Sequence, residues 1–422
     1  MSAAPQDDSL LIYAPVPLHG PEGALTLERQ ACNGLHLWAE NFERVIAVLP
    51  HAEGPAPPSW RPISEVGPSL ERIELVPIPE AFRPDRFARA YRAGRALWRA
   101  QIPRARYLSF AIGGLFGDWG AVGALEARAQ GRRFAVWTDR VESEVVRRTA
   151  RSSPLLRRRV RDALTWRPMR ALERAVIRRA DLGLFHGRET FEAYAPYCGG
   201  PSELVHDIHI SREDHIGEER LRAKARDAAA GPLRIAYAGR ADPMKGPGEW
   251  IETLARLDRA GVSFEATWLG EGSERAAMLR RIEEAGLGGK VSAPGHVDDP
   301  AAVHALVRGA HIFLFCHKTP ESPRNLIEAL VGGAPIVGYE SAYPADLICG
   351  HGGGVLVPLG DAGALAEAVL ALDRDRARLA RLIEAAAADG APFEDRKVFA
   401  HRSDVIKRHL GRRPERGEDP DP

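Results

Sequence analysis

The chain has 422 residues, of which 45% are hydrophobic and 27% are charged, and its formal net charge is +1. This length exceeds the size at which a single hydrophobic core stops growing, so two globular domains are predicted. The near-neutral charge argues against a general nucleic-acid-binding protein, and four cysteines without a Cys-x-x-Cys pair argue against a disulfide framework or a zinc site.

One short apolar run, residues 10–16, lies near the N-terminus. It is too short for a signal peptide or a membrane span, and Asp7 and Asp8 precede it where a signal peptide carries basic residues. The widely spaced cysteines fit a reducing compartment. We therefore expect a cytoplasmic protein.

Short apolar runs alternate with segments of helical periodicity in the first half of the chain. Strands are predicted at residues 10–15, 44–50, 73–78, 107–112, 134–137, 181–186 and 204–209, and helices at 82–100 and 119–130. The first strand is followed by a loop with glycines that leads into a helix, as at the start of a doubly wound sheet. This alternation predicts a parallel sheet covered by helices on both faces.

The same alternation restarts after a charged, alanine-rich stretch at residues 216–231. Strands are predicted at 233–239, 264–269, 290–293, 311–316, 335–339 and 354–357, with helices at 248–260, 273–285, 300–309, 326–331 and 361–372. The predicted domains are residues 1–215 and 216–390, both Rossmann-like, followed by a helix at 391–410 that packs back on the first domain and a disordered tail at 411–422.

Two cations follow the first strand of the second domain. Arg240 and Lys245 lie where a parallel strand gives way to its helix, which is where open α/β sheets bind ligands. A guanidinium and an ammonium can together neutralise a diphosphate. The alternative is a solvated Arg and Lys in a polar turn.

Two glutamates flank the start of a later helix. Glu321, in the preceding loop, can accept hydrogen bonds from sugar hydroxyls, and Glu328, within the helix, from a ribose diol. The backbone N–H groups of Arg324, Asn325 and Leu326 are expected to point at phosphate oxygens. The alternative is that Glu321 merely complements the helix dipole and Glu328 is a surface charge, but the apolar run around Glu328 disfavours a solvated glutamate.

Several of these motifs occur together in a characteristic order. Together they resemble the motifs of glycosyltransferase family 4. The motifs are Gly239-Arg240 with Lys245-Gly246, Leu269 to Gly272, Gly295-His296-Val297, and Glu321 to Glu328 followed by 329–337. The resemblance implies retaining enzymes of GT-B fold, with two Rossmann-like, doubly wound parallel-sheet domains of α/β class facing a cleft. It covers the second domain strongly and the first weakly.

The resemblance also implies a role for each matching residue. Arg240 and Lys245 would hold the donor diphosphate, Glu321 the donor sugar, Glu328 the ribose, and Gly295, His296 and Val297 the base. Retaining members are described as metal-independent, so no cofactor or metal is expected beyond the nucleotide-diphosphate sugar itself, and Asp373-Arg374-Asp375 is interpreted as solvated charge.

The sequence departs from the family pattern at two points. Glu321 and Glu328 are separated by six residues, whereas the family has seven, and strict counting back from Glu328 reaches Pro320. In the first domain Thr138 replaces the usual histidine before Asp139. Asp139 is a candidate to orient or deprotonate the acceptor hydroxyl, the alternative being a helix N-cap, and His19 is a candidate for phosphate or acceptor contact.

Residues 147–179 carry twelve arginines against Asp162 and Glu173, over a helical stripe of apolar residues with Trp166 between. Such a composition fits a helix lying on an anionic membrane surface, or a solvated outer face. The preferred hypothesis is a retaining glycosyltransferase of surface polysaccharide or glycoconjugate assembly at the cytoplasmic membrane face, with a glycan or lipid-linked acceptor. The alternatives are transfer to a soluble small-molecule acceptor and a non-catalytic GT-B-like binding subunit.

Overall fold

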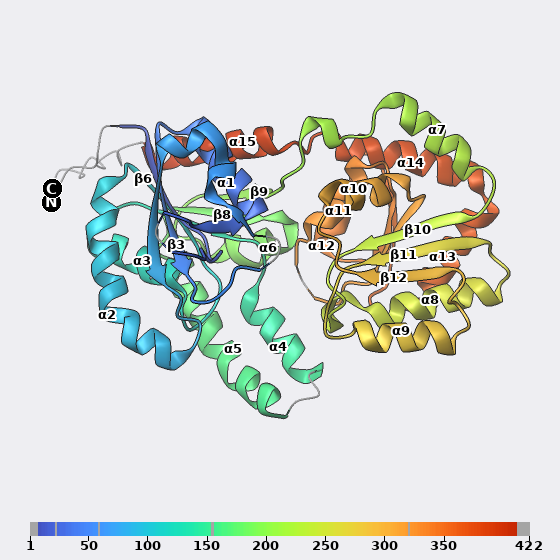
Figure 1. Ribbon diagram of the computed structural model, residues 1–422, viewed down its shortest axis with the longest axis horizontal. Coiled ribbons are helices and arrows are strands. Elements are labelled where there is room, and N and C mark those ends of the chain that lie inside the picture. The colour runs from blue at the N-terminus through green and yellow to red at the C-terminus, as the bar shows by residue number, and fades with distance from the viewer. Residues whose placement is uncertain (1–6, 22, 58–59, 153–155, 320, 412–422) are drawn as a thin grey trace, which may run out of the picture. The chain divides into compact units, whose positions relative to one another are not determined.

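The computed structural model describes residues 7–21, 23–57, 60–152, 156–319 and 321–411. Within these ranges the chain forms two compact units, unit 1 from residues up to 143, 164–209 and 396–411, and unit 2 from 144–163 and 210–395 (Figure 1). Residues 144–163, predicted to belong to the first domain, group with unit 2, where Arg148 Nη1 donates a hydrogen bond to the carbonyl of Lys318 (3.2 Å). The predicted tail lies outside the described residues after Gly411.

Unit 1 is built on a seven-stranded parallel sheet in the order β5-β3-β1-β6-β7-β8-β9. The strands are β1 (Ser9–Tyr13), β3 (Arg44–His51), β5 (Ile73–Pro79), β6 (Tyr107–Ala111), β7 (Ala135–Thr138), β8 (Leu182–His186) and β9 (Ser202–Val205). A small antiparallel pair, β2 (Thr26–Glu28) and β4 (Trp60–Pro62), stands beside it. The central strands are buried along their whole length, as their apolar runs predict.

Helices cover both faces of this sheet (Figure 1). One face carries α1 (Arg29–Asn41) and α15 (Asp395–Gly411), and the other carries α2 (Pro84–Gln101), α3 (Trp119–Ala129) and the C-terminal part of α5 (Leu156–Ile177), with α6 (Gly187–Tyr194) next to β8 and β9. Trp98, Phe110, Trp119 and Phe134 are fully buried in the core beneath α2 and α3.

Helix α15 is joined to unit 1 by a buried ion pair. Arg402 Nη1 donates to Asp207 Oδ1 at 2.7 Å, and both side chains are at most 10% exposed. The same guanidinium lies over the rings of Trp38, Trp137 and Phe399. An element distant in sequence is therefore part of the unit 1 core.

Unit 2 is built on a six-stranded parallel sheet in the order β12-β11-β10-β13-β14-β15. The strands are β10 (Leu233–Ala238), β11 (Phe264–Leu269), β12 (Val291–Gly295), β13 (Ile312–Phe315), β14 (Ile336–Tyr339) and β15 (Gly354–Val357). The helices are α4 (Glu142–Ser152), α7 (Glu218–Ala228), α8 (Pro247–Arg259), α9 (Arg275–Glu284), α10 (Pro300–Gly309), α11 (Arg324–Val331), α12 (Ala342–Leu347), α13 (Ala362–Arg374) and α14 (Arg376–Gly390). The two predicted parallel-sheet domains are confirmed.

The strand order reverses between β10 and β13 in unit 2. Successive strands run outward from β10 through β11 to β12, and the chain then returns to place β13 on the other side of β10. Crossovers on opposite faces leave a crevice at the carboxyl ends of these two strands, where open α/β sheets bind ligands. The loops after β10 and β13 contain Arg240, Lys245 and Glu321, and α11, which follows the second loop, carries Arg324, Asn325, Leu326 and Glu328.

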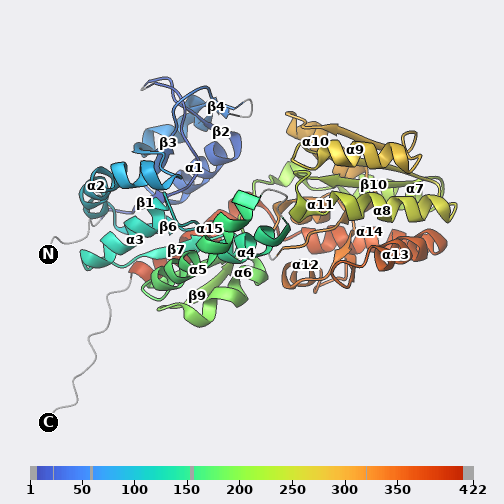
Figure 2. The same ribbon diagram turned by 90° about the horizontal axis from the view of Figure 1, so that it is seen from below.

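The arginine-rich region forms two helices, α4 and α5 (Figure 2). On α5, Val160 and Leu164 are 51% and 71% exposed. Arg167 and Arg170 lie over the ring of Trp166 at 5.1 and 4.8 Å from its centroid. Across the described parts of the chain, no helix combines the length and apolar character needed to cross a bilayer.

Candidate nucleotide-sugar site

Lys245 and Glu321 form a buried ion pair at the switch point of unit 2. Lys245 ends a short 3-10 turn after β10, Glu321 lies in the loop after β13, and Lys245 Nζ donates to Glu321 Oε1 at 2.7 Å. Both side chains are only 10% exposed. The two residues that were predicted separately for diphosphate and sugar are therefore in direct contact.

The glycine after Lys245 makes this approach possible. Gly246 has a φ of 65°, and a Cβ atom there would lie 2.4 Å from the carbonyl oxygen of Cys316 at the end of β13. A side chain at this position would therefore be strained by its backbone conformation and would collide with β13. The glycine thus allows the 3-10 turn that ends at Lys245 to pack closely against the end of β13.

His317 is a buried residue close enough to Lys245 to be affected by its charge, and it was not predicted. Its Nε2 hydrogen-bonds with the Tyr237 hydroxyl at 2.8 Å, and Tyr237 stacks on Trp268. Burial, and secondarily the charge of Lys245, hold the pKa of His317 well below its usual range, so the ring is neutral at pH 7. Its position directly after the apolar run of β13 is the signal that could have identified it.

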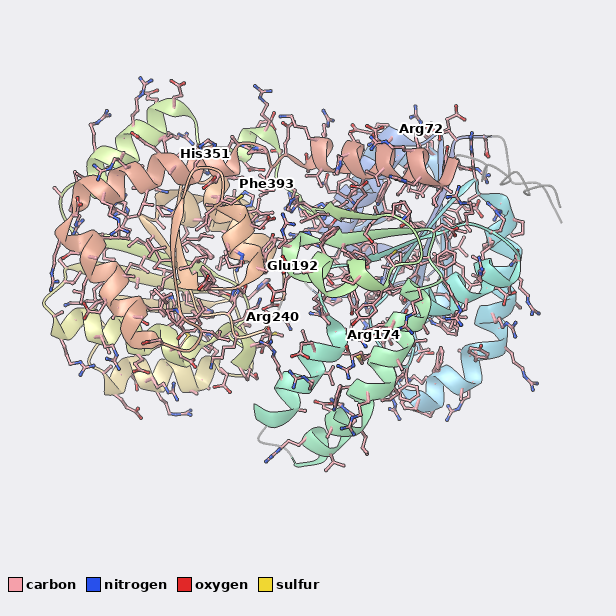
Figure 3. All side chains as sticks on the ribbon, turned by 180° about the vertical axis from the view of Figure 1, so that it is seen from behind. Arg72, Arg174, Glu192, Arg240, His351 and Phe393 are labelled. Atoms are coloured by element: carbon pink, nitrogen blue, oxygen red, sulfur yellow. The ribbon has the colours of Figure 1, made fainter. Side chains whose placement is uncertain are left out.

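Arg240 lies on the surface, unlike Lys245. Its side chain is 66% exposed and pairs with Asp242 Oδ2 at 3.2 Å (Figure 3). An exposed guanidinium of this kind can reorient at little energetic cost. The structure places it in the loop after β10, without contact to Glu321 among the described interactions.

The N-terminus of α11 differs in part from its prediction. Pro323 is the N-cap residue, and Asn325 Nδ2 donates to the carbonyl of Ala238 at the end of β10 (2.7 Å), which ties the helix start to the switch point. The backbone N–H of Leu326 donates to the carbonyl of Pro323 (3.2 Å). The N–H of Leu326 is therefore already hydrogen-bonded within the turn. Leu326 was one of the three predicted phosphate donors, with Arg324 and Asn325.

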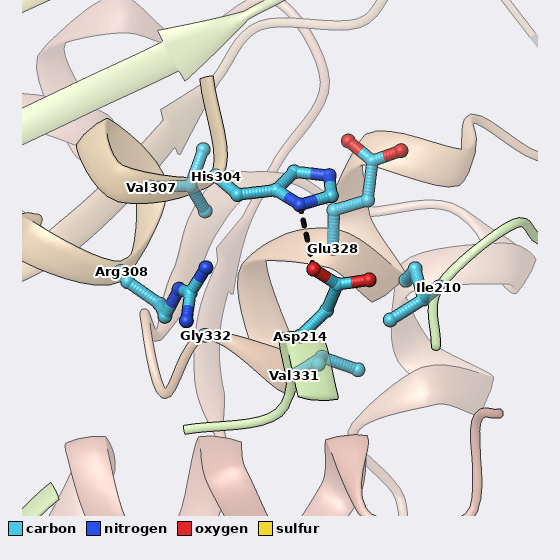
Figure 4. A pocket seen from close by; sticks show the side chains of 8 residues that line it. All are labelled: Ile210, Asp214, His304, Val307, Arg308, Glu328, Val331 and Gly332. Carbon is cyan, nitrogen blue, oxygen red and sulfur yellow. Dashed lines mark hydrogen bonds and ion pairs between the residues drawn. The ribbon is translucent and has the colours of Figure 1, made fainter. Parts of the chain in front are cut away.

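Glu328 is half-buried on α11 beside a small pocket. The pocket is lined by Ile210, Asp214, His304, Val307, Arg308, Glu328, Val331 and Gly332 (Figure 4). No described side chain donates a hydrogen bond to the Glu328 carboxylate. Burial raises the pKa of this carboxyl, and the charges of His304 and Arg324 oppose that shift. Glu328 is thus an acceptor whose oxygens remain available to hydroxyl donors.

The predicted base-binding residues lie at the end of β12 at the edge of the sheet, and Gly295 is the last residue of that strand. Gly295 has a φ of 97°, and a Cβ atom there would lie 2.2 Å from Glu271 Oε1, so the loops after β11 and β12 touch at this glycine. His296 Nε2 pairs with Asp298 Oδ1 at 2.9 Å on the surface. Val297 follows in the same loop. Two strands, β11 and β10, separate β12 from β13 in the sheet.

The two candidates in unit 1 have different surroundings. The ring of His19 is buried edge-on against Trp60, and its Nδ1 lies 3.4 Å from the carbonyl of Gly54, in the loop after β1. Asp139 follows β7 and is half-buried, and its carboxylate makes no hydrogen bond to the described residues. Among the described residues, no group of three or more His, Cys, Asp and Glu is arranged to hold a metal ion.

Residues 220–389 match the family model of glycosyl transferases group 1. The chain is similar to the amylovoran biosynthesis glycosyltransferase AmsK of Erwinia amylovora, with 29% identity over 217 residues, covering 50% of this chain and 52% of that protein. It is also similar to the lipopolysaccharide core biosynthesis glycosyltransferase LpsE of Rhizobium meliloti, with 29% identity over 195 residues, 44% of this chain and 55% of that protein. The chain thus spans about half the length of these relatives.

The similarity of the fold extends over nearly the whole chain. The crystal structure of Anabaena Alr3699/HepE in complex with UDP matches 94% of this chain and 98% of that protein, with a TM-score of 0.64 and 15% sequence identity. The architecture of two parallel-sheet units is that of the GT-B glycosyltransferases. The predicted fold class is confirmed.

Proposed function

We propose that this protein is a retaining glycosyltransferase that moves a sugar from a nucleotide-diphosphate sugar to an acceptor hydroxyl in polysaccharide or glycoconjugate assembly. The observation that carries the proposal is the contact between Lys245 and Glu321 at the switch point of unit 2, with Glu328 on the following helix. The match of residues 220–389 to glycosyl transferases group 1 and the relatives AmsK and LpsE support it.

These residues are required to position the donor and to stabilise the negative charge of the departing diphosphate. Lys245, oriented by Glu321, and the mobile Arg240 offset the negative charge that builds up on the departing diphosphate. Glu328 accepts hydrogen bonds from the ribose diol, and Glu321 is within reach of the donor sugar held beside Lys245. In this proposal Asp139 orients the acceptor hydroxyl, and the leaving phosphate takes its proton.

A thermal-shift panel of UDP, GDP and ADP tests the donor half of the proposal. UDP is the expected ligand because Alr3699/HepE was crystallised with it. A ligand at a hundredfold excess over Kd stabilises by about 2.7 kcal/mol. We expect UDP to raise the Tm of the wild type and Glu328→Gln to lose most of that shift, while Glu367→Gln, an exposed glutamate on α13, keeps it. A panel in which no nucleoside diphosphate shifts the Tm would contradict the proposal.

We further propose that α5 rests on an anionic membrane surface, which would bring the enzyme to a lipid-linked acceptor. Val160 and Leu164 are one helical turn apart and exposed, and the guanidinium groups of Arg167 and Arg170 flank Trp166 further along the helix. Exposed apolar residues beside arginines suit the boundary between lipid headgroups and acyl chains.

Liposome co-sedimentation measures this binding. Vesicles with anionic lipid are expected to pellet the wild type at low salt and less of it as salt rises, because exposed charges are screened within about 10 Å at 0.1 M salt. Leu164→Glu should weaken pelleting by placing a charge at the apolar position, whereas Leu359→Glu, also exposed but outside α5, should not. Failure of the wild type to pellet at low salt would favour a soluble small-molecule acceptor.

A further inference from the structure

Asp214 is held in one orientation by two sets of hydrogen bonds. It belongs to a capping box in which the backbone N–H and the hydroxyl of Ser211 both donate to Asp214 Oδ2 at 2.9 Å. The other oxygen, Oδ1, lies 3.1 Å from His304 Nδ1 on α10. A carboxylate fixed in this way also fixes the orientation of the imidazole that donates to it.

The imidazole of His304 then lies next to Glu328. His304, Asp214 and Glu328 line one pocket, and Figure 4 shows the ring of His304 between the two carboxyl groups. The pocket holds about 10 Å³, enough for roughly one water molecule, so it cannot itself hold a nucleotide. The residues that line the pocket therefore do not form a separate nucleotide site, and their effect is on Glu328 instead.

We propose that His304, anchored by Asp214, is a positioning residue for Glu328, whose carboxylate it holds in place electrostatically for the ribose diol of the nucleotide. This inference rests on the proposed function, because it assigns a role toward the ribose to Glu328. The residues that carry it come from three different elements: Asp214 before α7, His304 on α10 and Glu328 on α11.

The charges around Glu328 agree with this role. Burial raises the pKa of Glu328 and Asp214 raises it further, whereas His304 and Arg324 lower it, and Arg308 also lines the pocket. Although burial alone would raise it, the pKa of Asp214 is below its usual value because Ser211 and His304 stabilise its charged form. Replacing His304 by an uncharged side chain therefore removes an interaction that lowers the pKa of Glu328.

The pH dependence of UDP binding tests the inference. A carboxylate with a raised pKa is lost as an acceptor when pH falls through that pKa, so UDP affinity of the wild type should decline on acidification. In His304→Gln, which can still hydrogen-bond to Asp214 but has no charge, the midpoint of that decline should move up by about one pH unit, because a nearby opposite charge shifts a carboxyl pKa by about one to three units. Isothermal titration with UDP between about pH 5 and 8 measures both curves.

Two further variants distinguish a positioning role from a structural one. His304→Lys, which places a positive charge at this position, should bring the midpoint back toward that of the wild type. In a Glu328→Gln background, His304→Gln should leave the residual UDP affinity and its pH dependence unchanged. An unchanged midpoint in His304→Gln, or the same shift in the absence of Glu328, would overturn the inference. If Glu328→Gln binds UDP as tightly as the wild type, the ribose role in the proposed function is wrong.

Discussion

Replacing Lys245 by methionine is expected to lower sugar transfer about tenfold to a hundredfold. One charge-assisted hydrogen bond is worth about 1.5–3 kcal/mol, and 1.4 kcal/mol corresponds to a factor of ten. The change also leaves the Glu321 carboxylate buried without its cation, and breaking a buried pair from one side costs about 3–5 kcal/mol of folding free energy. Activity and the free energy of unfolding should therefore fall together, as measured by a transfer assay and urea denaturation.

A double variant separates these two losses. Lys245→Met with Glu321→Gln removes both charges, so stability should return toward the wild type while transfer stays low. Lys290→Met is the matched control, because Lys290 precedes β12, an edge strand of the sheet, and forms an exposed ion pair with Asp258. If transfer by the Lys245 variant equals that of the Lys290 control, the assigned role of Lys245 in donor binding is wrong.

The largest loss of stability in unit 1 is expected for Arg402→Met. The substitution keeps an apolar side chain of similar length over Trp38 and Phe399, but it leaves the buried Asp207 carboxylate without its ion-pair partner. We expect a cost of about 3–5 kcal/mol. For a unit of this size that lowers Tm by on the order of 10 °C, which differential scanning calorimetry can resolve.

Arg396→Met provides the comparison on the same helix. Arg396 pairs with Glu40, but its side chain is 66% exposed, and surface pairs contribute about 0–1 kcal/mol. The two arginine variants should therefore differ by several degrees in Tm. Equal Tm values would show that burial of the Arg402–Asp207 pair has no energetic consequence.

Local sequence was enough to predict both sheets, because each buried parallel strand is a short apolar run bounded by turn residues. The same reasoning placed Lys245-Gly246 and Glu321 at strand ends, where their side chains meet. It did not predict that the two would pair with each other, since that depends on β10 and β13 being neighbours in the sheet. Strand order is a property of the whole fold and has no local signal.

The residues that sequence reasoning missed, or placed incompletely, depend on contacts between distant segments. Asp214 and His304 come from separate elements, and nothing around either residue indicates the other. His19 was predicted as a candidate from its loop, but the loop pairs with Thr26 and packs on Trp60, so its ring is buried. The contact with Trp60 depends on a strand pair between distant segments, which has no local signal in the sequence around His19.

The position of α15 also affects the order in which the chain folds during synthesis. Domains generally fold in the order in which they leave the ribosome. Here the sheet of unit 1 emerges first, but Asp207 and Trp38 meet Arg402 only after all of unit 2 has been made. Unit 2 therefore completes its core first, and unit 1 keeps an unfilled apolar face until its last helix arrives.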